Sequence, residues 1–304
     1  MDSYWALMFF LALASAGAAA WHPVAIGTMA EQMPTRRAFA LGLHFVGGSF
    51  MEVLAPVVAG ILLVYLDWQS VLVITATPAM VMGIVFLRLH KSIRLSPHGR
   101  MSVSDLKAQA QLVRKSTSLA SLGILGLHNM ALMGMWSMLP LYLVEERDIS
   151  PSGAGVLFAV MVLSGSLGAV LIGRLIDSHN RKPLTLSALI AGAISPLLIF
   201  WAPNMPVLVA AMMLAGLAIM GLIPALVAIA LSIVGGRQMV MIGLIMAAGD
   251  IVAALGAVLA GLAGEVDLRL SLGLVSTITL CTTLLVAVHP LTPAVQKEEV
   301  APAM

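Results

Sequence analysis

Long apolar segments, each separated from the next by a short polar stretch, run along the whole chain. Breaking the sequence at its charges, Pro pairs and Gly clusters gives nine of them, at residues 5–30, 38–65, 69–88, 117–144, 152–173, 183–201, 206–234, 239–263 and 269–288. A helix rises about 1.5 Å per residue, so about 20 residues cross the ~30 Å hydrocarbon layer of a bilayer. The pattern therefore predicts nine transmembrane helices and an all-α, polytopic membrane protein.

The composition excludes a water-soluble globular protein. Of the 304 residues, 60% are hydrophobic and 10% are charged, and the mean hydropathy is +1.03. Soluble domains carry about 25% charged residues, which they need to cover their surface. The apolar start of the chain has Asp2 where a signal peptide has Lys or Arg, and it continues to Met29. We therefore expect a retained membrane helix there.

Candidate reaction chemistry is sparse. The sole cysteine, Cys281, lies in the last apolar segment, so a disulfide framework is excluded and a small buried hydrophobe is expected. We find no phosphate-binding loop, dinucleotide fingerprint or Cys/His metal spacing, and no segment presents a catalytic constellation. The sequence predicts no cofactor, no metal ion, no nucleic-acid partner and no enzymatic activity.

The basic residues are strongly biased to one set of connecting loops. Fourteen of the sixteen Lys and Arg residues fall in that set, namely Arg36, Arg37, Arg88, Lys91, Arg94, Arg100, Lys107, Arg114, Lys115, Arg174, Arg181, Lys182, Arg237 and Lys297. The other set holds Arg147 and Arg269. Because loops rich in Lys and Arg stay in the cytoplasm, we expect the N-terminus outside and the C-terminus inside a cell (inner or plasma) membrane.

The chain contains an internal repeat. A shift of 201 residues aligns Pro23 with Pro224, Arg36 with Arg237, Gly42 with Gly243, Gly48 with Gly249, Ala59 with Ala260 and Gly60 with Gly261. The register pairs the first three segments with the last three, and the loop charges give both copies the same sidedness. Such parallel repeats relate the two halves of some transporters about an axis along the membrane normal.

One cytoplasmic loop carries a specific motif. Residues 173–183, GRLIDSHNRKP, resemble the G-x-L-x-D-x-x-G-R-K loop of the major facilitator superfamily, with Asn180 in place of the usual Gly. The resemblance implies a two-bundle transporter fold and a latch at the inner gate, formed by Gly173, Asp177, Arg181 and Lys182. Asp177 would pair with Arg181 or with the dipole of a neighbouring helix. A plain positive-inside loop is the alternative.

A second motif points to a subfamily. Residues 47–56, GGSFMEVLAP, resemble the Gly-rich, Pro-bearing fifth helix of drug exporters of this superfamily, and with the surrounding residues they are most similar to fosmidomycin-resistance-type exporters. Gly47 and Gly48 would let helices approach closely, and Pro56 would bend the span.

The resemblance also implies a domain organisation. Residues 1–88 would be a three-helix remnant of the N-terminal half, with three further helices expected before Met1, and 117–289 the six-helix C-terminal half. Residues 89–116 would form a basic cytoplasmic linker and 290–304 a cytoplasmic tail. In the linker, Ser102 and Asp105 form a capping-box pattern ahead of an amphipathic stretch, which predicts a short surface helix. A disordered linker is the alternative.

Three intramembrane groups could carry protons. Glu52 and Asp250 lie near the middle of their segments, where a carboxylate costs several kcal/mol unless it is neutralised, paired or hydrated. His128 lies mid-segment and is the third candidate. The alternative for the acids is a protonated packing residue, and for the imidazole a neutral hydrogen-bonding group.

Four further residues are candidates for the substrate cavity. His22 and Asn129 are polar within spans, and Met133 and Trp136 could form an adaptable apolar wall. Ordinary core packing is the alternative, because Met is abundant in this chain.

We therefore expect a protein that moves a small molecule by alternating access in a lipid bilayer, with protons as the coupling ion and export as the direction. An importer of a small metabolite on the same fold remains an alternative, since fold fixes neither direction nor cargo. A non-transporting fragment is a further alternative.

Overall fold

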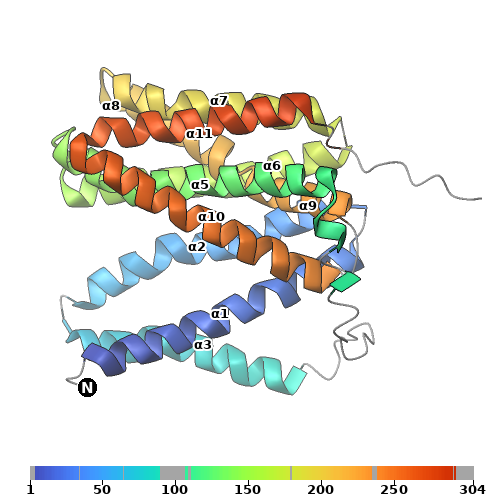
Figure 1. Cartoon of the computed structure of the whole chain (residues 1–304). Coiled ribbons are helices and arrows are strands. Elements are labelled where there is room, and N and C mark those ends of the chain that lie inside the picture. The colour runs from blue at the N-terminus through green and yellow to red at the C-terminus, as the bar shows by residue number, and fades with distance from the viewer. Residues whose placement is uncertain are drawn as a thin grey trace, which may run out of the picture.

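The computed structural model of the chain describes residues 4–33, 35–63, 65–89, 107–108, 111–178, 180–234, 238–289 and 291. Within these ranges the regular elements are all helices (Figure 1). They are α1 (Tyr4–Gln32), α2 (Arg37–Leu63), α3 (Trp68–Leu89), α5 (Ser116–Glu145), α6 (Pro151–Ser178), α7 (Arg181–Trp201), α8 (Met205–Ala215), η2 (Gly216–Met220), α9 (Ile223–Val234), α10 (Gln238–Val266) and α11 (Leu268–Val288). The predicted all-α fold is confirmed.

The helices follow the predicted segments closely, with one difference in the count of spans. Eight described stretches are long and apolar enough to cross a membrane, and α8, η2 and α9 together make one of them, Met205–Val234. The predicted span at 38–65 forms α2, which is helical over 27 residues. Among the described residues, α2 is not one of these eight stretches.

The helices form two groups of unequal packing. Helices α5 to α11 pack into one bundle, while α1, α2 and α3 lie along one side of it (Figure 1). In this arrangement α2 packs against α6 and α9, α1 packs against α10, and α3 packs against α2. The Met205–Val234 span is 78% buried over its apolar window and α3 only 6%, so the α8–η2–α9 span is the most buried of the eight.

Contacts between connections show which helix ends lie together. At one end, the Arg147 guanidinium donates to the Ala202 carbonyl at 2.6 Å and Arg269 pairs with Glu146 at 2.7 Å. At the other end, the backbone N–H of Phe39 donates to Asp177 at 3.0 Å. The end that holds Arg147 and Arg269 is thus the one where the sequence has few basic residues.

The two copies of the predicted repeat run in the same direction. In Figure 1, α1 and the α8–η2–α9 span both run from left to right, α2 and α10 both run back, and α3 and α11 both run from left to right again. A parallel repeat requires this arrangement. The orientation of the termini across a membrane stays a prediction.

A close approach of backbones joins α2 to α6. A Cβ atom added to Gly42 would lie 2.5 Å from the carbonyl oxygen of Ala169, and one added to Gly173 would lie 2.8 Å from that of Ala38. Only glycine fits at either position without a shift of the backbone.

Gly47 and Gly48 meet no other described helix, so their predicted packing role stays a prediction. Both are exposed, and a Cβ atom added to either would meet no described atom within 4 Å. The reason is rotational: each residue turns a helix by about 100°, so the face of α2 that meets α6 carries Gly42 and not the later pair. The side chain of Pro56 lies outside the described residues.

The central span is interrupted by a π-helical turn, η2. Four glycines, Gly165 and Gly168 on α6 and Gly216 and Gly221 around η2, bring the two backbones together, because a Cβ atom on any of them would crowd the facing helix. Such turns widen the hydrogen-bond pattern of a helix and often occur at functional sites.

Short polar residues start several helices. Asn180, Asn204 and Asp267 each cap the helix that follows, accepting from Lys182 N, Val207 N and Arg269 N. Asp67 accepts from the Ser70 backbone N–H at 2.7 Å, which lowers the pKa of its carboxyl. These caps fix where the connections turn.

Two sequence predictions lie outside the described residues, and a third is corrected. The capping box at Ser102 and Asp105 and nearly all of the tail at 290–304 lie outside them. Cys281, expected to be buried, is exposed on α11. It lies on the outer face of the bundle because the neighbouring Thr282 and Thr283 take the inward positions.

Candidate functional site

A polar cluster lies where α1 and α2 meet α10. The imidazole rings of His22 (α1) and His44 (α2) contact each other edge to face, with centroids 6.2 Å apart. The carboxyl group of Asp250 (α10) lies within electrostatic range of His22. The Nδ1 atom of His22 is buried and has no hydrogen-bond partner among the described residues. The cluster thus combines one acid with two bases inside membrane-spanning helices.

Asn129 on α5 reaches the same turn of α10. A Cβ atom added to Gly249 would lie 3.1 Å from the Asn129 Nδ2 atom, so glycine at 249 leaves room for the amide. The Asn129 Oδ1 atom is buried and lacks a partner among the described residues. The structure therefore brings His22, Asn129 and Asp250 to one region, and adds His44.

The cluster lies between the two helix groups, where a change of its charge would affect how they interact. Two of its residues come from the α1–α3 group and two from the α5–α11 bundle. Ionisable groups inside a bilayer are costly and usually line a path for ions or substrates. A proton gained or lost by Asp250 would change its attraction to His22, and with it the interaction between the two helix groups.

The predicted gate residues gather at the end of the bundle that holds the α1–α2 and α6–α7 connections. Asp177 accepts a hydrogen bond from the backbone N–H of Phe39 in the first turn of α2. Of the two partners expected for Asp177, the structure thus shows the neighbouring helix N-terminus. The Arg174 guanidinium lies 4.5 Å from the centroid of the Phe39 ring. Together they tie α6 to α2 across the boundary between the two helix groups.

The basic residues of the same motif tie α7 to other helices. Arg181 donates to the Ser232 hydroxyl on α9 at 3.1 Å, and Lys182 donates to the Ala287 carbonyl near the end of α11 at 2.7 Å. Asn180 accepts from the Lys182 backbone N–H at 3.3 Å, so it caps α7 where the motif usually has Gly. Every predicted gate residue therefore makes an inter-helix contact or, as for Gly173, permits one.

His128 lies against the π-helical turn. It is fully buried, and its Nε2 atom is 2.7 Å from the carbonyl oxygen of Ile219 in η2. Because a carbonyl only accepts, the proton sits on Nε2, and Nδ1 is buried without a partner among the described residues. This geometry favours the hydrogen-bonding alternative over proton coupling.

We expect His128→Ala to destabilise the protein by about 1–3 kcal/mol, because the buried carbonyl of Ile219 would lose its donor. The thermal unfolding midpoint in detergent measures the loss. His128→Gln can donate to the same carbonyl and should restore part of the stability. Equal stability of His128→Ala and the wild-type protein would show that the hydrogen bond between His128 and Ile219 does not stabilise the fold.

The two remaining cavity candidates belong to an apolar cluster. The rings of Trp136 and Phe158 contact each other edge to face at 5.5 Å, and Met133 and Trp136 pack against buried residues of α5, α6, α8 and α11. Core packing, the alternative weighed for both, accounts for these contacts. The side chain of Glu52 lies outside the described residues, so its role stays a prediction.

Comparison with known protein families identifies the family of the chain. The family model of the Major Facilitator Superfamily matches residues 1–127 and 121–303. The chain belongs to the major facilitator superfamily. Members of this superfamily are multi-pass membrane transporters and not enzymes, as the sequence predicted.

Within the superfamily, one curated relative is a "Putative metabolite transport protein" of Haemophilus influenzae. It is 26% identical over 193 residues, which cover 60% of this chain and 47% of the relative. The chain thus spans about half the length of the curated relative it matches. Transport by this chain and its resemblance to drug exporters are therefore taken up as proposals.

Several residues of the site escaped the sequence analysis of this superfamily member. His44 lies within the predicted span at 38–65, and nothing in the sequence paired it with His22. Phe39 and Ser232 bind the gate residues through a backbone N–H and a hydroxyl, groups that carry no sequence signal. Gly42 stood out only in the repeat.

Proposed function

We propose that the chain exports a small molecule in exchange for protons, with Asp250 as the group that takes up and releases the proton. The observation that carries the proposal is the position of Asp250. It is the thirteenth residue of α10, about 18 Å along the helix, and its carboxyl group lies within electrostatic range of His22 in the other helix group.

The coupling would work through the charge of Asp250. When it is ionised, its attraction to His22 holds α10 against α1, and when it is protonated that attraction is lost. The helix groups could then rock apart around the cluster. The ties at Asp177 and Arg174 would have to break in the state open to the basic end, which makes them a latch.

Export is the direction that the resemblance of residues 47–56 to drug exporters supports. Uptake of a metabolite is the second candidate, because the Haemophilus influenzae relative is named for metabolite transport and that name states no direction. The two candidates share the cluster at Asp250 and differ in the direction of substrate flow relative to the proton gradient.

Everted membrane vesicles that contain the full chain test this proposal. With the interior acidified, a set of lipophilic drugs and small metabolites is added, and internal pH is followed with a fluorescent amine. For an exporter, a substrate makes protons leave the vesicle, and the signal recovers. An importer would show proton-driven uptake in right-side-out vesicles instead. No substrate-dependent proton movement in either preparation, compared with vesicles lacking the protein, would reject the proposal.

A further inference from the structure

Four arginines surround one carboxylate at the end of the bundle where α2 and α7 begin. Two adjoining cavities, of about 270 and 260 Å³, lie there and share Thr35 and Asp177. Arg37 and Arg181 line the first, and Arg36 and Arg174 line the second. Four positive charges against one negative charge leave a net charge of +3 among these side chains.

In the first cavity Arg181 already donates to the neutral Ser232 hydroxyl, and Arg37 is the arginine that is poorly matched. Asp177 already accepts from Phe39, and Arg37 is repelled by Arg181 more than it is attracted by Asp177. The Nε atom of Arg37 is buried and has no hydrogen-bond partner among the described residues. A buried charged donor without an acceptor is costly, so this arrangement calls for an anion between the guanidinium groups.

Two helix N-termini add to the positive potential. Helix α2 starts at Arg37 and α7 at Arg181, and because both residues line the first cavity, the partial positive charge of each helix end lies beside it. A phosphate group is the anion that arginines bind best, since its oxygens match the fork of the guanidinium. The chemistry thus favours a phosphate ligand over a carboxylate.

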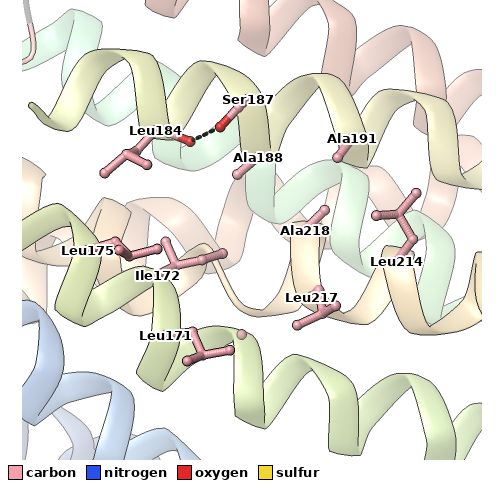
Figure 2. Close-up of a pocket in the computed structure, with 11 residues that line it drawn as sticks. Leu171, Ile172, Leu175, Leu184, Ser187, Ala188, Ala191, Leu214, Leu217 and Ala218 are labelled. Atoms are coloured by element: carbon pink, nitrogen blue, oxygen red, sulfur yellow. Dashed lines mark hydrogen bonds between the residues drawn. The ribbon is translucent and has the colours of Figure 1, made fainter. Parts of the chain in front are cut away.

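An apolar stripe beside the arginines indicates the source of that phosphate. Leu163, Leu167, Leu171 and Leu175 recur every four residues on α6 and are 47, 63, 53 and 44% exposed. Arg174 lies next to the last of them on the same helix. Leu171 and Leu175 also line an apolar cavity of about 260 Å³. Leu184 on α7 and Leu214 on α8 are among its other walls (Figure 2). An acyl chain fits such a surface, and free phosphate makes no use of it.

We propose that the arginine cluster around Asp177 binds the phosphate of an anionic phospholipid whose acyl chain lies along the leucine stripe of α6. The ligand reaches the site from the surrounding leaflet, and its charge offsets the repulsion between Arg37 and Arg181. Binding ties α2, α6 and α7 together at the predicted gate. Basic pockets between membrane helices bind such headgroups in general.

Lipid binding to the purified full chain tests the proposal without any transport assay, so its outcome is independent of the role of Asp250. Native mass spectrometry and the unfolding midpoint are measured with phosphatidylglycerol and with phosphatidylcholine. We expect tighter binding and a higher midpoint with phosphatidylglycerol. Arg37→Gln and Arg174→Gln should each weaken that binding about fivefold.

The control is Arg88→Gln, which removes an exposed basic residue in the last turn of α3 and leaves both cavities unchanged. It should bind phosphatidylglycerol as the wild-type protein does. If Arg37→Gln fails to fold, Arg36→Gln and Arg174→Gln, which change exposed residues, are compared with the wild-type protein instead. Equal phosphatidylglycerol binding by all variants would overturn the proposal. Full stabilisation by inorganic phosphate alone would also overturn it and assign the site to a soluble anion.

Discussion

We expect Asp250→Asn to lose nearly all substrate-driven proton movement and to keep the helical fold. The amide is nearly the same size as the carboxyl group but cannot take up a proton, so the coupling step would be lost. We expect a decrease on the order of 100-fold in the rate of proton release from everted vesicles, as for other groups that transfer a proton directly. Circular dichroism and gel filtration would confirm that the variant folds.

Glu265→Gln is the matched control for this experiment. Glu265 is an exposed acid near the end of the same helix, outside the cluster, so its substitution should leave the rate unchanged. Exchange of substrate without net proton movement should survive in Asp250→Asn, since it needs only the rocking step. Wild-type proton release by Asp250→Asn would show that another group, with Glu52 the next candidate, carries the proton.

Gly42→Ala destabilises the protein, whereas Gly47→Ala five residues later on the same helix stabilises it slightly. The added methyl at 42 would lie 2.5 Å from the backbone of Ala169, and a backbone cannot rotate away as a side chain can. Such overpacking costs about 1–3 kcal/mol. At 47 the methyl meets no described atom, and the gain in helix propensity is at most about 1 kcal/mol.

Both glycine variants are compared by unfolding in detergent under one set of conditions. Because the two substitutions make the same chemical change in one helix, the difference between them isolates the α2–α6 contact. Equal stability of the two would mean that α2 does not lie against α6 as described. Loss of stability only in Gly47→Ala would support the packing role predicted for that glycine.

The helices could be predicted well because hydrophobic length is a property of each segment alone. The segment at 117–144, for example, forms α5 over Ser116–Glu145. The sequence did not predict the π-helical turn, where Gly216 packs against α6 and His128 donates to the carbonyl of Ile219. Both are contacts between segments far apart in the sequence.

The same limit applies to the candidate site. Asp250 stood out because a charge in an apolar segment is visible in the sequence itself. The contact between His22 and His44 depends on the rotation of two helices about their axes, which an unaligned sequence does not fix. For the same reason the sequence alone did not place Met133 and Trp136 against the apolar cluster of buried residues that they contact.

The single exposed thiol on α11 makes this chain convenient for distance measurements. A spectroscopic label attached at Cys281 marks the α5–α11 bundle at one position, and no native cysteine needs to be removed first. One engineered cysteine on α1 would then define a unique pair. The separation of that pair, followed as the pH changes, would report directly whether the two helix groups move as rigid units.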